Sequence, residues 1–442
     1  MAIEVFGRSA TLTYALAMTC VAAALLALWR CARLLLGPDG ALVALLLSSV
    51  DYYLMGRGSF LNHNTVMLPF VALSAWAVLK IAAGAGWRVW LMLGLLQALG
   101  MLTKYQMGLI ACANGLALLA AGVHHQPRFA RHALLAAGAT LLPLVPHVIW
   151  LSGHHFSTFH YAGQSLLAGL GLIARLRGAG AFLGQQLGRL APVAIASAIA
   201  WAIDRAWRRA PPPGARAVTT GAPARAFMVM ALAPLAGIIL LTLGFGVAAQ
   251  NHWGASSTLL IPVYLCLALR CFSNRSILSC TLAVLTVHAG AIAWNVYVWA
   301  YNPGLHHRFA ARPLAALAQT YWARHQHGDI PVLIGADWEA GSLSIYLAGQ
   351  PPVVPAADWS QSPWVDPETV KACGGLVIGR AGTPLEQQVP GIPGAELRDP
   401  DVVSWRDAMG RESSVQLAYL APGPGASCGA GHPETVPGTS AP

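Results

Sequence analysis

The acidic residues of this chain are distributed so unevenly that they limit what its first 300 residues can fold into. Only four of the seventeen Asp and Glu residues precede Tyr301, namely Glu4, Asp39, Asp51 and Asp204. Long apolar runs lie between them, and a water-soluble domain of this length needs a charged surface that these residues do not provide. We therefore expect residues 1–300 to be surrounded by lipid.

Composition and segment length indicate an all-α polytopic membrane domain with about ten transmembrane helices. Hydrophobic residues make up 56% of the chain and charged residues 10%, and a transmembrane helix needs about 20 predominantly apolar residues. The expected spans are roughly Thr11–Trp29, Gly40–Gly56, Asn64–Ile81, Arg88–Leu102, Gln106–Gly122, Ala133–Leu151, Leu190–Ile203, Phe227–Val247, Ser256–Leu269 and Ile277–Trp299. Tyr161–Ile173 is expected to form an amphipathic helix on the membrane surface or a re-entrant segment.

The other thirteen acids lie between Asp329 and Glu434 and indicate a second, water-exposed domain over residues 301–420. A helical pattern at Phe309–His327 is followed by short apolar strands, which predicts a small α/β domain. The predicted strands are Pro331–Gly335, Pro352–Val354, Gly375–Ile378 and Val415–Leu420, with a helix at Ser342–Leu347. Residues 421–442 are rich in Pro and Gly and are expected to be disordered.

Lysine and arginine in the loops predict the orientation. Alternate loops hold thirteen and six basic residues, and the richer set is expected in the cytoplasm. This places the C-terminal domain on the side of the membrane opposite the cytoplasm. Nucleic acid is not an expected partner, because the positive charges are spread along loops instead of being gathered on one face.

Lys104 is the most informative single residue. It is the only charged residue in the apolar stretch Leu91–Gly122, and a lysine within a bilayer is costly. One interpretation is a lysine at a helix end whose ammonium reaches the interface. The other is a cation that binds a lipid phosphate at the outer interface.

Several segments resemble the GT-C group of polytopic sugar transferases, which includes protein O-mannosyltransferases and lipid A aminoarabinose transferases. The most specific is Leu93–Gln106, which contains Thr103-Lys104-Tyr105. Asn62–Leu68, Pro146–Leu151 and His252-Trp253 are similar to further family segments, in the same order. The resemblance extends from about Phe6 to Trp299.

The resemblance implies transfer of a sugar from a polyprenyl-phosphate donor to a hydroxyl of a lipid, glycan or protein at the outer face, with inversion. Such a reaction needs a cation for the leaving phosphate and a base for the acceptor proton. Lys104 and Arg57 are the candidate phosphate-binding residues. The candidate substrate-binding residues are Asn62, His63, Asn64, Tyr105, His252 and Trp253. The sequence assigns no cofactor, and the polyprenyl-phosphate sugar is the expected donor substrate. No histidine spacing matches a closed zinc motif, while the family includes members with and without a metal, which leaves a divalent metal open.

The base is harder to assign. The family carries its catalytic aspartate in the first outer loop, and Glu4–Ala10 resembles the end of that loop, so the first span and the catalytic loop are expected to be absent. Asp51 is the candidate replacement, although an acid at a helix end is the alternative interpretation. A non-catalytic relative that binds a polyprenyl lipid stays open as a function, and so does a transporter or flippase, which is less favoured because the spans contain no charge pairs.

The eight cysteines fall into two groups. Six lie in or beside the expected spans and are interpreted as small core residues. Cys373 and Cys428 are the two in the C-terminal domain, and we predict that they form a disulfide outside the cytoplasm.

Overall fold

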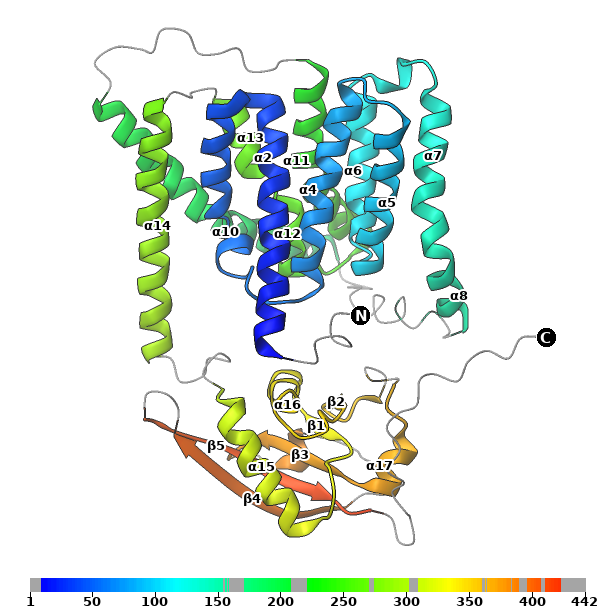
Figure 1. Ribbon diagram of the computed structural model, residues 1–442, viewed down its shortest axis with the longest axis vertical. Coiled ribbons are helices and arrows are strands. Elements are labelled where there is room, and N and C mark those ends of the chain that lie inside the picture. The colour runs from blue at the N-terminus through cyan, green and yellow to red at the C-terminus, as the bar shows by residue number, and fades with distance from the viewer. Residues whose placement is uncertain are drawn as a thin grey trace, which may run out of the picture. The chain divides into compact units, whose positions relative to one another are not determined.

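The computed structural model describes residues 9–153, 156, 158, 171–207, 221–269, 274–301, 309–359, 362, 364–382, 384–388, 396–406 and 410–422. The predicted surface helix at Tyr161–Ile173 and the predicted disordered tail fall almost entirely outside these residues, and so does Cys428. The chain divides into two compact units, one formed by Ala10–Ile292 and one that begins at Ala293 (Figure 1).

The first unit is built from helices. Six are long and apolar enough to cross a membrane, and Trp87–Thr103 and Met107–Ala120 are shorter apolar helices. The elements are α2 (Ala10–Ser49), α3 (Tyr52–Met55), α4 (His63–Ala82), α5 (Trp87–Thr103), α6 (Met107–Ala120), η1 (Val123–His125), α7 (Phe129–Leu141), η2 (Leu142–Leu144), α8 (Val145–Gly153), α10 (Leu172–Trp207), α11 (Ala222–Phe245), η3 (Asn251–Trp253), α12 (Gly254–Thr258), α13 (Ile261–Leu269) and α14 (Asn274–Tyr301), which continues into the second unit.

Two predicted spans are joined within α2. Gly37 has φ 73° and ψ −175°, which is not helical, and Pro38 follows it. A glycine adopts this positive φ without a side-chain clash, and a proline has no N–H with which to continue the preceding helix. The chain therefore turns here between the predicted spans Thr11–Trp29 and Gly40–Gly56 (Figure 1).

Small residues allow these helices to pack closely. Ala24, Ala27 and Ala72 of α2 and α4 are at most 1% exposed. At Gly94 of α5, an added Cβ would lie 2.3 Å from the carbonyl oxygen of Ala136 in α7. Close backbone approach of this kind is the usual way in which helices associate in lipid, where apolar side chains gain little by leaving the solvent.

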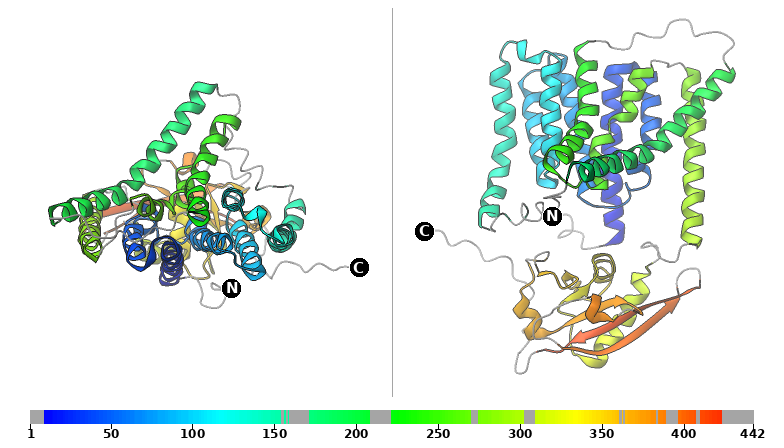
Figure 2. Two further views of the ribbon diagram at one scale, coloured as in Figure 1. Left: turned by 90° about the horizontal axis from the view of Figure 1, so that it is seen from above. Right: turned by 180° about the vertical axis from the view of Figure 1, so that it is seen from behind.

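α10 differs from the expectation. The span was predicted at Leu190–Ile203, whereas the helix extends from Leu172 to Trp207 and crosses the other helices at an angle (Figure 2). It includes Arg175 and Arg177, which were expected in a loop, and Arg189. Its N-terminal half has a mixed polar sequence, so hydrophobicity alone marked only its apolar C-terminal part.

Arginines lie over tryptophan rings at one end of this unit. Each guanidinium carbon is 4.9 to 5.9 Å from the ring centroid, a distance at which a cation is attracted to the ring face. The pairs are Arg30 with Trp76, Arg33 with Trp29, Arg88 with Trp87, and Arg205 with Trp201. They occur near the α2 turn, the C-terminal ends of α4 and α10, and the start of α5, in loops that were assigned to the cytoplasm.

The second unit contains a five-stranded mixed sheet with strand order β2-β1-β3-β5-β4. Its elements are α15 (Ala311–His325), β1 (Leu333–Gly335), α16 (Asp337–Ser344), β2 (Val353–Pro355), α17 (Pro367–Cys373), β3 (Gly375–Arg380), α18 (Leu385–Gln388), β4 (Leu397–Arg406) and β5 (Glu412–Leu420). Leu314 and Leu343 of α15 and α16 pack in one core cluster, and Val370 and Leu385 of α17 and α18 in another. The four predicted strands are present.

β4 was not predicted. It is a 10-residue edge strand that pairs with β5, and most of its residues are exposed. Its sequence includes Asp399, Pro400 and Asp401, which are typical of turns, and a register shift lies between Arg398 and Asp401. Most positions of this bulged edge strand are exposed and only Trp405 is buried, so its sequence shows no clear alternation.

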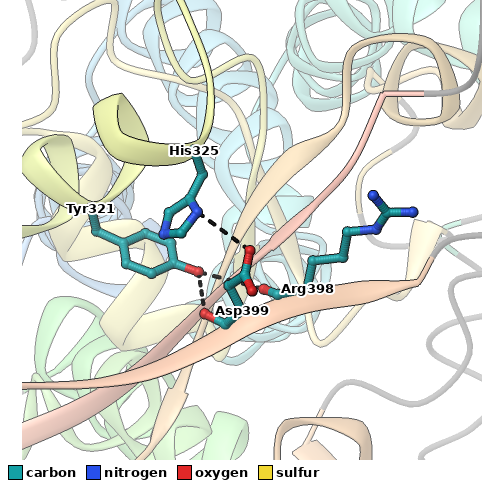
Figure 3. Close-up of polar contacts among 4 residues, drawn as sticks. All are labelled: Tyr321, His325, Arg398 and Asp399. Atoms are coloured by element: carbon teal, nitrogen blue, oxygen red, sulfur yellow. Dashed lines mark hydrogen bonds and ion pairs between the residues drawn. The ribbon is translucent and has the colours of Figure 1, made fainter.

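A polar contact joins α15 to this bulge (Figure 3). The Tyr321 hydroxyl donates to the carbonyl oxygen of Asp399 at 2.7 Å, and His325 Nδ1 lies 3.4 Å from Asp399 Oδ2. Asp399 itself has φ 46°. The imidazole of His325 also stacks on Tyr419 of β5, with 5.1 Å between centroids. The unusual backbone of the bulge is therefore fixed by two side chains of one helix.

The described cysteines test one part of the predicted Cys373–Cys428 disulfide. Cys31, Cys266 and Cys280 are free and buried within the helical unit. Cys373 is disulfide-bonded. Because Cys428 lies outside the described residues, its pairing with Cys373 stays a prediction.

Candidate functional site

The first turn of α4 begins at a side-chain cap. Asn62 Oδ1 accepts hydrogen bonds from the backbone N–H groups of Asn64 at 2.8 Å and Thr65 at 3.2 Å. An asparagine at this position satisfies donors that the helix itself leaves without partners. The cap fixes His63 and Asn64 at the end of the bundle, where both were predicted to meet substrate.

Lys104 lies directly opposite this turn. It ends α5 in an extended conformation, and its Nζ donates to Asn64 Oδ1 at 2.6 Å. Burial lowers the pKa of Lys104 to about 8, so the ammonium is still mostly charged at neutral pH. A partly desolvated cation held by a neutral amide keeps most of its charge available for an anion.

His252 lies on the same side of the unit, in the short helix η3. Its ring centroid is 6.1 Å from that of His63, and the two rings are nearly perpendicular at 76°. Partial burial, and after it the charges of Lys104, His63 and Arg189, lower the pKa of His252 to about 4. The imidazole is therefore neutral at pH 7, and the residue remains accessible to solvent.

The backbone on the N-terminal side of His252 is held by α3 and α10. The carbonyl oxygen of Asn251 accepts hydrogen bonds from Tyr53 Oη at 2.7 Å, from Gln186 Nε2 at 3.2 Å and from Arg189 Nη1. Gln186 and Tyr53 are 0% and 6% exposed, and Tyr53 Oη lies 2.9 Å from Gln186 Oε1. We call Tyr53, Gln186 and Arg189 the Asn251 latch.

The backbone on the C-terminal side is held as well. The carbonyl oxygen of Trp253 accepts from Gln106 Nε2 at 2.7 Å and from Ser257 Oγ at 3.0 Å. Gly254 follows, and an added Cβ there would lie 1.7 Å from Gln186 Oε1 and 2.5 Å from Tyr53 Oη. Only a glycine allows the loop to approach the latch this closely.

Tyr105 directs its hydroxyl toward α8. The hydroxyl lies 2.6 Å from His147 Nε2 and 3.2 Å from Thr158 Oγ1. The His147 ring stacks on Trp150 with an interplanar angle of 11°. Tyr105 follows Lys104 in the sequence, but its side chain contacts a separate cluster that contains His147 and Trp150.

Asp51 and Arg57 have local roles. Asp51 is 1% exposed and caps α3 by accepting from the backbone N–H of Tyr53 at 2.9 Å. Burial raises the pKa of Asp51 to about 7. Arg57 Nε donates to Tyr52 Oη at 3.3 Å, and the guanidinium lies over the ring of Phe60. These contacts match the helix-end interpretation of Asp51, and Arg57 has no described contact with Lys104 or His252.

Among the described residues, no group of three or more His, Cys, Asp or Glu side chains could hold a metal ion. His154, His155 and His160 lie outside them.

Sequence reasoning missed the Asn251 latch as a site element. Arg189 was counted only as a loop charge, although an arginine within a long apolar helix is itself a signal of function or of specific pairing. Gln186 gave no signal, because its partners Tyr53 and Asn251 are 133 and 65 positions away in the sequence.

Comparisons with known proteins agree with this architecture. A family model described as dolichyl-phosphate-mannose-protein mannosyltransferase matches residues 1–150. The fold is similar to that of ArnT from Cupriavidus metallidurans bound to undecaprenyl phosphate, with a TM-score of 0.55 and 15% identity over 94% of this chain and 85% of that chain. For the apo state of that ArnT the TM-score is 0.54 and the identity 13%, with the same coverage. No curated protein matches significantly. The protein therefore has an ArnT-like GT-C fold, and its first 150 residues match the dolichyl-phosphate-mannose-protein mannosyltransferase family model.

Proposed function

We propose that this protein transfers a hexose or pentose from a polyprenyl-phosphate donor to the hydroxyl group of a lipid, glycan or protein, with inversion at the anomeric carbon. The observation that carries the proposal is the half-buried Lys104 ammonium, held by Asn64 at 2.6 Å beside His63 and His252. The similar ArnT structure, which is described as bound to undecaprenyl phosphate, supports a lipid phosphate as the ligand.

The chemistry explains why such a site is sufficient on the donor side. The leaving group is a phosphate monoester of a lipid, and its negative charge grows as the bond from the anomeric carbon to oxygen breaks. A fixed cation stabilises this developing charge more than it stabilises the bound donor, and this difference accelerates the reaction. Lys104 supplies the cation, and we assign no phosphate contact to Arg57.

The remaining substrate-binding roles follow from position. Asn64 orients the ammonium, Asn62 fixes the turn that carries Asn64, and Tyr105 with Trp253 borders the same end of the bundle. Aromatic rings and amides are suited to sugar, which offers hydroxyl groups and apolar ring faces. We place this end at the outer face of a bacterial inner membrane, because the other end carries more of the loop arginines.

Binding of undecaprenyl phosphate tests the donor site directly. We expect Lys104→Met to weaken binding at least tenfold, because it removes the charge while keeping a side chain of similar length. Lys80→Met is the matched control, because Lys80 lies in the last turn of α4, at the opposite end from His63. Equal binding by the two variants would contradict the donor site.

Transfer is measured separately, in membranes supplied with a panel of radiolabelled undecaprenyl-phosphate hexoses and pentoses. Loss of label from the donor and gain of label in an acceptor, both dependent on Lys104, support the enzyme. Binding of undecaprenyl phosphate without transfer of any sugar would instead favour the non-catalytic lipid-binding alternative. Movement of the intact donor across the membrane would favour a flippase.

A further inference from the structure

The strand order in the sheet of the second unit reverses between β1 and β3. β1 pairs in parallel with β2 on one side and with β3 on the other. The chain leaves β1 through α16 to reach β2, and then returns through α17 to β3 on the opposite side of β1. Open α/β sheets bind ligands outside the carboxyl ends of the strands at such a reversal. We therefore looked for polar side chains at the carboxyl ends of β1 and β3.

The chain leaves these two strand ends toward opposite faces of the sheet. Successive residues of a strand point to opposite faces, and Leu333 and Ile334 of β1 accordingly belong to different core clusters. The cluster of Leu333 includes Leu343 of α16, which follows β1, whereas the cluster of Ile334 includes Leu385 of α18, which follows β3. Connections that diverge in this way leave the space outside the two strand ends accessible to a ligand.

A pair of oppositely charged side chains lies at these strand ends. Glu339 is in the first turn of α16, shortly after β1 ends at Gly335, and Arg380 is the last residue of β3. Arg380 Nε lies 3.8 Å from Glu339 Oε1, and the two side chains are 73% and 17% exposed. The carboxylate is thus largely enclosed, whereas the guanidinium is open to solvent.

We propose that Glu339 and Arg380 are part of a binding site for a neutral saccharide, whose hydroxyl groups donate hydrogen bonds to the carboxylate and accept them from the guanidinium. The proposal goes beyond the transfer reaction proposed above, because it concerns a second ligand site in the other unit of the chain. It does not depend on the residues around Lys104. The distance within the pair and the charges around it indicate the class of ligand.

The two charged groups are too far apart to form a good hydrogen bond with each other. A charge-assisted hydrogen bond from nitrogen to a carboxylate oxygen is about 2.7 to 2.9 Å long, whereas Arg380 Nε and Glu339 Oε1 are 3.8 Å apart. A hydroxyl group is both a donor and an acceptor. One hydroxyl between these atoms can therefore donate to the carboxylate and accept from the guanidinium at normal lengths, and a sugar carries several such groups on one ring.

The charges at this edge of the sheet disfavour ionic ligands. An anion such as a phosphate would be repelled by Glu339 and by Asp337, the exposed first residue of α16. A cation such as a primary amine would first meet Arg380, which is the more exposed member of the pair. A neutral sugar is subject to neither repulsion, so the site favours it over a phosphorylated or an amino sugar.

The backbone after β2 supports the same edge. Ala356 and Ala357 have φ of 47° and 59°, and the N–H of Ala356 donates to the carbonyl oxygen of Gly335 at 2.8 Å. Residues with a side chain seldom adopt positive φ, and such backbones are concentrated at functional sites. The hydrogen bond holds the chain after β2 against the end of β1, so the segment that leads to Glu339 is fixed by a second strand.

Saccharide binding by the intact protein in phospholipid nanodiscs tests the site. Nanodiscs are needed because the sugar headgroups of glucoside and maltoside detergents would compete for it. The probes are glucose, galactose, mannose and maltose, and we expect at least one of them to bind. We expect its Kd to rise about tenfold in Glu339→Gln and in Arg380→Gln, because each variant replaces a charge-assisted hydrogen bond by a neutral one.

Glu396→Gln is the matched control. Glu396 also pairs with an arginine, Arg398, at 3.6 Å. Its neighbour Leu397 pairs with Leu420, which in turn pairs with Gly375 at the start of β3, so the control lies at the opposite end of that strand from Arg380. Its Kd should stay within about twofold of the original, as for a surface substitution away from the ligand.

Two further measurements accompany the titrations. Thermal unfolding checks that each variant keeps its fold, and if Glu339→Gln does not, Arg380→Gln carries the test, because its side chain is 73% exposed. Amide hydrogen exchange of the unaltered protein locates the ligand. We expect the bound sugar to slow exchange in residues 336–340 and 379–382, which follow β1 and β3.

The outcomes decide this site separately from the transfer reaction. Failure of all four sugars to bind, or an equal Kd in the unaltered protein and the Glu339 and Arg380 variants, overturns the proposal. Tighter binding of glucose 6-phosphate or glucosamine than of glucose overturns the neutral class of ligand. Loss of sugar binding in Lys104→Met would move the sugar to the helical unit and also overturn it. Sugar binding that persists in Lys104→Met supports the site, whatever that variant does to undecaprenyl phosphate.

Discussion

Lys104 illustrates at the scale of one residue how environment determines function. Its charge was evident in the sequence, but its amide partner and its half-buried position were not, and burial lowers its pKa to about 8. A lysine whose pKa is below its usual value of about 10.4 keeps its charge below the folded pKa and loses it as pH rises. The donor site should therefore weaken in mildly alkaline solution.

We expect the Kd for undecaprenyl phosphate to rise as pH increases from 8 to 10. A bound phosphate favours the ammonium, so the midpoint should lie at pH 8 or somewhat above it. Lys104→Arg should remain charged throughout this range, since a guanidinium does not lose its proton there. Binding titrations at a series of pH values compare the two proteins, and a Kd for the lysine protein that does not depend on pH would contradict Lys104 as the phosphate ligand.

At the scale of elements, the approach of the η3 loop to α10 depends on Gly254. Its backbone is closer to Gln186 and Tyr53 than any side chain would allow, so the position of His252 follows from a residue that carries no chemistry. Local patterns in the sequence give no indication of this, because the contact joins segments far apart in the chain.

We expect Gly254→Ala to lower sugar transfer about 100-fold, because a shift of about 1 Å in a positioned group has an effect of this size. Gly115→Ala is the matched control, since Gly115 lies in α6 with no atom within 4 Å of its added Cβ. That variant should keep its activity and gain slightly in helix stability. Kinetics of the two purified proteins make the comparison, and similar activities would show that the latch does not position the loop.

The edge strand β4 depends on a contact with another element in the same way. The hydroxyl of Tyr321 in α15 holds the Asp399 carbonyl of the bulge (Figure 3). We expect Tyr321→Phe to destabilise this strand locally by about 1 kcal/mol, so that amide hydrogen exchange of residues 397–406 becomes about fivefold faster. Tyr346→Phe, at a position 40% exposed, is the control. Unchanged exchange in the Tyr321 variant would mean that pairing with β5 is sufficient.

At the scale of the whole molecule, the basic residues predict one orientation. We expect alkaline phosphatase fused after Pro422 to be active, because that enzyme folds outside the cytoplasm, where its disulfides form. The same enzyme fused after Gln126, between η1 and α7, should be inactive. Phosphatase activity of the two fusions in whole cells makes the test, and the reverse pattern would put the Lys104 end in the cytoplasm.

Much of the architecture could be predicted because lipid imposes a simple rule on sequence. Helices such as α4, α5, α6 and α11 begin and end within a few residues of the predicted spans, since a membrane helix must be apolar over its whole length. The prediction for α10 was too short and β4 was not predicted, because neither element has a uniform apolar face. Within the site, the structure brings together Lys104, Asn62, Asn64 and His252, whose binding roles stay predictions. Gln186 and Arg189 were not predicted, because side-chain contacts between distant segments leave no periodic pattern.

Lys80 and the turn that holds Asn64 lie at opposite ends of α4, so the length of this helix separates them. α4 has 20 residues from His63 to Ala82, which at 1.5 Å per residue is about 30 Å, the thickness of the hydrocarbon layer of a typical bilayer. Lys80, in the last turn of α4, belongs at one headgroup level, because a lysine at a helix end extends its ammonium to the interface. Asn64 then brings Lys104 to the opposite level, where the phosphorus atoms of a leaflet lie. The length of α4 therefore determines whether the Lys104 ammonium meets a lipid headgroup at one surface of the bilayer when Lys80 lies at the other.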